Sequence, residues 1–91
     1  PLTIYSYMSS GKPIVATRRK THTQVLDDST AFLANPDPIP FGESIYDAIN
    51  KHNLSIEKAE KAKRLVEQKY SYEVFQKKLL KAYSSINSIN G

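Results

Sequence analysis

Apolar residues at the start of the chain repeat with the spacing of a helix. Ile4, Tyr7 and Met8 lie three and four residues apart, which places them on one helical face. Gly11 supplies a permissive backbone at which a helix can stop, and Pro13 cannot continue it. The pattern therefore predicts a short helix that ends just before this glycine.

Two compact apolar runs follow, and each predicts a short strand. Residues 14–17, Ile-Val-Ala-Thr, come directly after the helix stop and are rich in β-branched side chains, which is typical of a strand buried on both faces. Residues 31–34, Ala-Phe-Leu-Ala, form a second strand candidate, and one helical turn is expected before it at residues 24–26. A helix, a turn and a strand in this order belong to parallel α/β sheets.

The second half of the chain predicts three helices. The first runs from Phe41 to about His52, with Pro38 and Pro40 tolerated at or before its first turn. Ser55 is a good N-cap for a second helix that ends near Tyr70, and Ser71 is one for a third. The third helix has a continuous apolar stripe, formed by Tyr72, Phe75, Leu79, Ala82, Tyr83 and Ile86.

This order of elements predicts an incomplete α/β fold with short parallel strands and several helices. Two parallel strands do not form an independently stable sheet, because both faces and both edges need cover. The chain also begins with Pro1 rather than Met and enters a periodic apolar segment at once. We therefore expect it to be a piece of a larger protein, with the rest of the sheet upstream.

Composition limits the classes of protein that fit. The 91 residues are 40% hydrophobic and 24% charged, which suits one small folded domain, or part of one. The absence of Cys excludes disulfides and thiolate metal sites and agrees with a cytoplasmic setting. No apolar run approaches the roughly 20 residues of a membrane span. The net charge of +4 suits phosphate ligands, nucleic acid or anionic lipid.

The densest positive cluster, Arg18-Arg19-Lys20, lies where the first predicted strand ends. Open parallel sheets hold their ligands beyond the carboxyl ends of the strands. Arginine is suited to bidentate contacts with phosphate. A solvated basic loop explains the same residues equally well, so both interpretations stay open.

The remaining polar residues predict no catalytic constellation and no metal site. His22 and His52 are not at metal-ligand spacing, which favours ordinary surface or loop histidines. Asp27 and Asp28, followed by Ser-Thr, favour a turn with self-capping side chains over a pair of catalytic acids. Between Lys58 and Lys81, lysines alternate with glutamates, which indicates a solvent-facing helix rather than a nucleic-acid groove. The tyrosines of this region are expected in the core.

An ordered set of short motifs resembles one family. The run PLTIYSYMSSGKPIVAT at residues 1–17 is similar to the donor-site segment of group 1, family-four glycosyltransferases of the GT-B fold, in which a short helix leads to Gly-Lys-Pro and a strand ending in Ala-Thr or Ala-Ser. The later pieces look like that family's closing segments at similar spacings; they are residues 22–28, 37–38, 62–64 and 70–72.

This resemblance implies that residues 1–91 are the C-terminal part of a Rossmann-like donor-binding domain, with an N-terminal acceptor domain absent. The family transfers a sugar from a nucleotide sugar to an acceptor hydroxyl with retention of configuration, and needs neither metal nor cofactor as a rule. The isolated fragment is expected to be inactive. Its partners would be the nucleotide sugar and the N-terminal domain of the same protein, with contact at the inner face of a membrane left open.

The resemblance also implies a donor site. Backbone N–H groups at Leu2 and Thr3 would meet the diphosphate, Ser6 would face the ribose, and Arg18 and Arg19 are phosphate-contact candidates. Three positions depart from the family: Ser6 replaces a glutamate, Gln24 replaces another, and Lys20-Thr21 replace a glycine pair.

A second hypothesis comes from a different class of protein. The C-terminal helices would form a basic binding module that contacts acidic partners or anionic lipid through residues 58–81. Removal of charge would then affect binding when it is made in these helices, rather than in the loop at residues 18–20 or the helix at residues 2–6. The strand-like residues 14–17 favour the glycosyltransferase.

Overall fold

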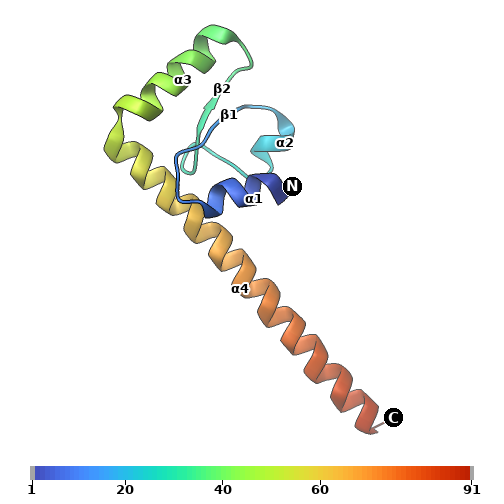
Figure 1. Ribbon diagram of the computed structural model, residues 1–91. Coiled ribbons are helices and arrows are strands. Elements are labelled where there is room, and N and C mark those ends of the chain that lie inside the picture. The colour runs from blue at the N-terminus through green and yellow to red at the C-terminus, as the bar shows by residue number, and fades with distance from the viewer. Residues whose placement is uncertain (1, 91) are drawn as a thin grey trace.

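The computed structural model describes the backbone of residues 2–90 and the side chains of residues 4–86. It is a mixed α/β fold that is mostly helical, with one long helix extending from a small folded region (Figure 1). The elements in chain order are α1 (Leu2–Ser9), β1 (Val15–Thr17), α2 (Lys20–Thr23), β2 (Phe32–Ala34), α3 (Pro38–Asn50) and α4 (His52–Asn90). The long axis of the molecule measures 63 Å, against 25 and 16 Å across it.

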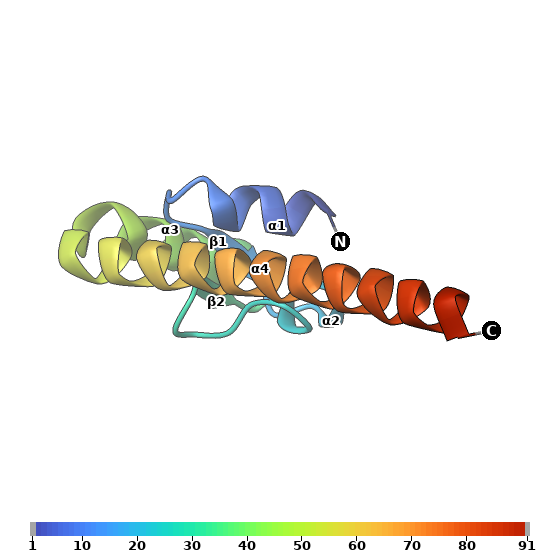
Figure 2. The same ribbon diagram turned by 90° about the horizontal axis from the view of Figure 1, so that it is seen from below.

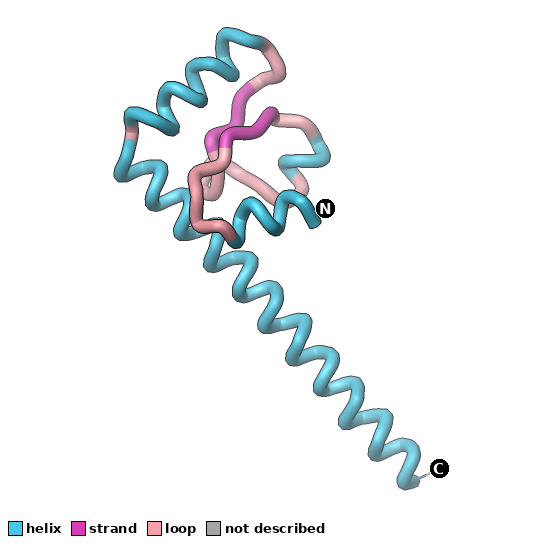
Figure 3. The backbone as a smooth tube through the Cα atoms, viewed as in Figure 1, coloured by secondary structure: helices cyan, strands magenta, loops and turns pink. Residues whose placement is uncertain are grey.

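The two strands pair in parallel at the centre of the folded region (Figure 3). Val15 is in register with Phe32, and Thr17 is in register with Ala34. Both predicted strands and their parallel direction are confirmed. β2 is buried along its whole length, whereas β1 is only half-buried, so the expected burial of both faces holds for β2 alone. Each strand has one unpaired edge among the described elements, and β2 is covered more completely because α3 packs mainly against it.

The first helix ends where the sequence predicts. α1 stops at Ser9, and the Ser10 amide and hydroxyl both donate to the Tyr7 carbonyl oxygen, at 3.2 and 2.6 Å. Gly11 then adopts a φ of +73°, in the left-handed region that side chains other than glycine rarely enter. This residue turns the chain from α1 into β1.

The core lies where α1, the strands and the first half of α4 meet. It is formed by Met8, Leu26, Ala31, Leu33 and Ala62, all of which are buried. α4 contributes alanines to this contact, so its backbone comes close to the sheet. Lys58 of α4 donates to the Ala31 carbonyl oxygen at 2.9 Å, and its ammonium lies 4.4 Å from the centre of the Phe32 ring. A second tie joins Lys69 to the Tyr5 hydroxyl at 2.7 Å, which raises the pKa of Lys69.

Two helix boundaries differ from the prediction because proline and serine play other roles. α3 begins at Pro38, three residues before Phe41, since proline fits the first turn of a helix, where the amide has no helical partner. Ser55 is not an N-cap. It is buried in the first turns of α4, and its hydroxyl donates to the Ala48 carbonyl oxygen at 2.6 Å, which ties α4 to the end of α3. Likewise, the helical turn expected at residues 24–26 forms earlier, at Lys20–Thr23.

The predicted break at Ser71 is wrong, because α4 continues through it. No glycine or proline occurs between Gly42 and Gly91, and a serine within a helix costs only about half a kcal/mol relative to alanine. The second half of α4 extends beyond the other elements (Figures 1 and 2). The prediction that its tyrosines pack in the core is also wrong, since Tyr70, Tyr72 and Tyr83 are all more than 60% exposed.

Candidate functional site

The parallel strands bring two loops together at their carboxyl ends. β1 ends at Thr17 and runs into Arg18 and Arg19, and β2 ends beside it at Ala34. The Arg18 amide donates to the Ala34 carbonyl oxygen at 2.8 Å, so the start of the basic loop is fixed to the second strand. The prediction that the basic cluster lies at the strand end is therefore confirmed.

The two arginines of this loop have different surroundings. Arg18 Nη2 lies 2.8 Å from Asp28 Oδ1, and both side chains are largely exposed. Within the described part of the chain, Arg19 has neither an ion pair nor a side-chain hydrogen bond. Its side chain forms part of an open cavity of about 320 Å³, together with Thr17, Phe41 and the segment Pro36–Pro38. Arg19 is therefore a cation that is free to meet an anion in this cavity.

His22 is held by the strand end and faces a second cavity. Its Nδ1 lies 2.9 Å from the Thr17 carbonyl oxygen, which can only accept a hydrogen bond. Nδ1 therefore carries the hydrogen, and in the neutral ring Nε2 is left as an acceptor. The cavity, of about 230 Å³, is mostly apolar and is lined by Ile4, Tyr7, residues 14–17, His22, Leu26 and Phe41. The sequence indicated only an ordinary histidine here, because nothing in it reveals the contact with Thr17.

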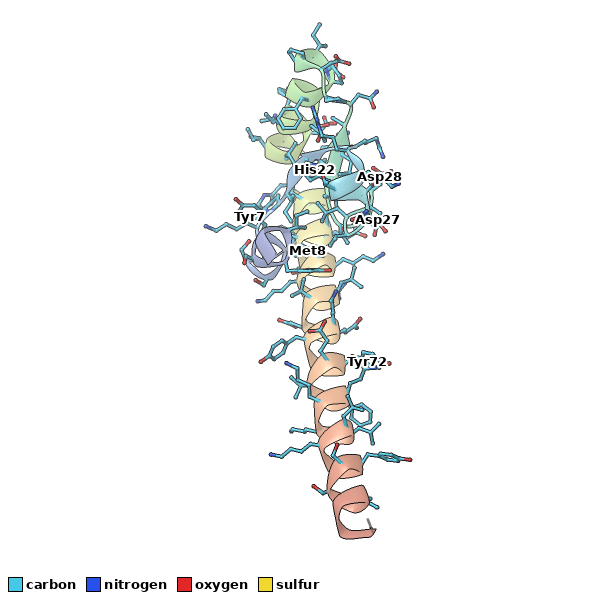
Figure 4. All side chains as sticks on the ribbon, turned by 90° about the vertical axis from the view of Figure 1, so that its right-hand side faces the viewer. Tyr7, Met8, His22, Asp27, Asp28 and Tyr72 are labelled. Atoms are coloured by element: carbon cyan, nitrogen blue, oxygen red, sulfur yellow. The ribbon has the colours of Figure 1, made fainter. Side chains whose placement is uncertain are left out.

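The two cavities share Thr17 and Phe41 in their walls, so they lie next to each other at the end of β1, and we refer to the pair as the depression. The N-terminal part of α1 contributes Ile4 and Tyr7 to it, and the start of α3 contributes Pro38. Figure 4 shows Tyr7 and His22 in the upper half of the view, where the folded region lies. The depression combines apolar walls, the guanidinium of Arg19, the carboxylate of Asp37 and one imidazole acceptor. The apolar walls and the guanidinium suit a ligand with an anionic part and a flat or apolar part, and Asp37 suits a hydroxyl donor beside them.

The chain matches no protein-family model, no curated protein and no solved structure. None of the described helices is both long enough and apolar enough to cross a membrane.

The five donor-site residues that the resemblance implies are only partly brought together. Arg19 lies in the depression, whereas Arg18 pairs with Asp28 outside it. Ser6 is exposed on α1 and belongs to neither cavity wall. Leu2 and Thr3 form the first turn of α1, and their side chains lie outside the described residues. Among the described residues, no group of three His, Asp or Glu side chains is arranged to hold a metal ion.

Asp27 closes a turn rather than forming a pair of acids with Asp28, as the sequence predicts. Its Oδ1 accepts a hydrogen bond from the Ser29 amide at 2.9 Å and another from the Ser29 hydroxyl. The Thr30 hydroxyl, buried beneath, donates to the Asp27 carbonyl oxygen at 3.2 Å. The hydrogen bond from the Ser29 hydroxyl is the main cause that lowers the pKa of Asp27.

We expect this turn to make stability fall at acid pH. Because the pKa of Asp27 is lower in the folded chain than its ordinary value of 3.8, its contribution is complete above that value and is lost as the pH falls through the lowered pKa. The carboxylate is exposed, so the effect should stay below about 1 kcal/mol. Urea unfolding of the protein and of Asp27→Asn, at steps between neutral and strongly acid pH, measures it. The two stability curves should converge toward low pH, and a constant gap would contradict the assignment.

Proposed function

We propose that this chain is the C-terminal part of the donor-binding, Rossmann-like domain of a retaining glycosyltransferase with the GT-B fold, which takes its sugar from a nucleotide sugar. One observation carries most of the proposal. The parallel register of β1 and β2 gathers Thr17, Arg19 and the start of α3 around a depression at the carboxyl edge of the strands. Parallel α/β folds bind nucleotides at this edge.

The proposal assigns roles in donor binding to Arg19 and to the N-terminal half of α1. In the transfer, the bond between the sugar and the nucleoside diphosphate breaks, and negative charge grows on the departing diphosphate. A guanidinium is suited to hold that charge because it donates two parallel hydrogen bonds. Arg19 would supply it, together with backbone N–H groups in the first turn of α1 at Leu2 and Thr3. Ser6, one turn further along α1, lines neither cavity and would face a ribose that extends from the depression along α1.

The difference between the two arginines tests the proposal. We expect Arg19→Gln to weaken the binding of UDP or GDP by about five- to tenfold, because one charge-assisted contact is lost. Arg18→Gln is the matched control, since the Arg18 guanidinium is already occupied by Asp28. Its effect should stay within about twofold. Titration calorimetry at low salt measures both affinities.

Two outcomes would count against the proposal. If neither nucleoside diphosphate binds while inorganic diphosphate does, the depression is an anion site without a nucleotide. If both arginine variants lose the same affinity, the loop attracts anions by its charge alone, as a solvated basic loop would.

A further inference from the structure

The two halves of α4 have their apolar faces on different sides of the helix. The first half packs against the folded region with Ser55, Ala59, Ala62 and Val66. The apolar stripe of the second half is between 55% and 65% exposed, and consists of Tyr72, Phe75, Leu79, Tyr83 and Ile86. At about 100° per residue, the centres of the two faces are roughly 130° apart around the helix axis.

This rotation turns the stripe away from α1, whereas α2 and the turn at Asp27 and Asp28 lie on the same side of α4 as Tyr72 (Figure 4). Figure 4 shows Tyr72 on the side of α4 opposite to α1 and Met8. The second half of α4 also extends past every other element in both ribbon views (Figures 1 and 2). A broad, flat surface can therefore approach the stripe along the part of α4 that extends beyond α2 and the other elements.

The charge of the chain lies on the same helix. α4 contains eight Lys and Arg residues and four Glu residues, which accounts for the whole net charge of +4, whereas residues 1–51 hold five charges of each sign. By helical spacing, Lys61 and Arg64 precede the stripe on its own face, and Lys78 lies beside it. Lys78 therefore borders the stripe on one side, and Gln76 and Glu73 lie toward the other. The helix as a whole is positively charged, and an anionic surface is its electrostatic complement.

We propose that residues 70–86 of α4 lie in the interface of an anionic membrane, parallel to its plane, with the stripe directed toward the acyl chains. A basic helix with a separate apolar face is the kind of segment that binds membrane surfaces. Tyrosine rings suit this depth, because their apolar bodies and polar hydroxyls match the headgroup boundary. Lys77 and Lys81 lie on the opposite face, where their ammonium groups remain in water.

The charge favours lipid over a second copy of the chain. Two such segments would pair stripe to stripe, each with three lysines and one glutamate in residues 70–86, a net charge of +2, and would repel one another. An anionic bilayer gains from the same charge. The inference rests on α4 alone and does not depend on the proposed function.

Vesicle partitioning of the full chain, with a matched pair of double variants, tests the inference. Phe75→Ser with Leu79→Ser removes apolar side chains from the stripe. Tyr70→Ser with Leu80→Ser removes side chains that are equally exposed, at 68% and 67%, but lie off the stripe. All four positions are exposed, so neither double variant removes a core contact. Circular dichroism checks that both retain the helix.

We expect the protein to bind phosphatidylcholine vesicles containing about 30% phosphatidylglycerol and to bind phosphatidylcholine alone at least about tenfold more weakly. The stripe variant should lose at least about tenfold in partitioning onto the anionic vesicles, and the control variant less than about twofold.

Three results would overturn the inference. The first is no binding to anionic vesicles. The second is equal loss in both double variants, which would leave charge alone as the cause. The third is a dimer, measured by light scattering, that the stripe variant abolishes and that anionic vesicles do not dissociate. That result would assign the stripe to a second copy of the chain.

Discussion

Replacement of Met8 by alanine is expected to lower the free energy of unfolding by about 2–4 kcal/mol. Met8 is 2% exposed and lies in the core formed by α1, the strands and α4, where Leu26 and Ala62 surround it. Truncation leaves a cavity there, because the neighbouring backbones are held by the sheet and by α4. A domain of this size has only a few kcal/mol of stability to lose, so the variant should be largely unfolded at 37 °C. Thermal and urea unfolding followed by circular dichroism measure the change.

Leu80→Ala is the control for the Met8 variant. It also removes a large apolar side chain, but Leu80 is 67% exposed on the second half of α4. Its effect on the free energy of unfolding should stay within about 0.5 kcal/mol. Equal loss in the two variants would mean that the contact between α1 and α4 is not the core of the fold.

Gly11→Ala is expected to destabilise the fold by about 1–2 kcal/mol, which lowers the thermal midpoint by about 5–10 °C. The φ of +73° at Gly11 is the reason, since a Cβ atom makes this conformation unfavourable. Steric overlap is not the cause, because the added Cβ would lie 3.6 Å from Lys63 Cδ, an ordinary contact. The cost belongs to the backbone turn that carries the chain from α1 into β1.

The same substitution at Gly42 should have the opposite sign. Gly42 lies inside α3, and a Cβ there meets nothing within 4 Å. Gly42→Ala should therefore stabilise the protein by about 0.5–1 kcal/mol, through the higher helix propensity of alanine and the smaller freedom of its unfolded chain. A stabilising Gly11→Ala would show that the turn after α1 does not need a left-handed residue.

The parts of the fold that the sequence predicts are those determined over a few residues. A glycine followed closely by a proline, as at Gly11 and Pro13, stops a helix through local backbone geometry alone. A β-branched run such as residues 14–17 favours a strand for the same local reason. The helix starts expected at Ser55 and Ser71 are wrong, because capping is not determined by the serine alone. A serine is a cap only if the residues before it leave the helix, and here nothing interrupts the helix between His52 and Asn90.

The position of the basic loop was predicted, but the surroundings of its side chains were not. The sequence places Arg18 and Arg19 at a strand end, because the strand is recognisable and the loop follows it. The sequence does not show which of the two arginines is paired, since the partner of Arg18 is Asp28, ten residues away across α2. The contact between His22 and Thr17 has no sequence signal either, because it depends on how α2 folds back against the end of β1. The exposure of the stripe on α4 was missed as well, because an apolar face in a sequence looks the same whether or not the fold covers it.

The most direct test of the proposed donor site is a titration of the isotope-labelled protein with UDP and GDP, followed by the amide shifts of the whole chain. The account predicts that shifts are largest in the first turns of α1, at residues 17–22 and at the start of α3, and that they are absent from residues 70–86. These are the segments around the depression at the strand ends. Shifts confined to the basic residues of α4, or none with either nucleotide at millimolar concentration, would contradict it.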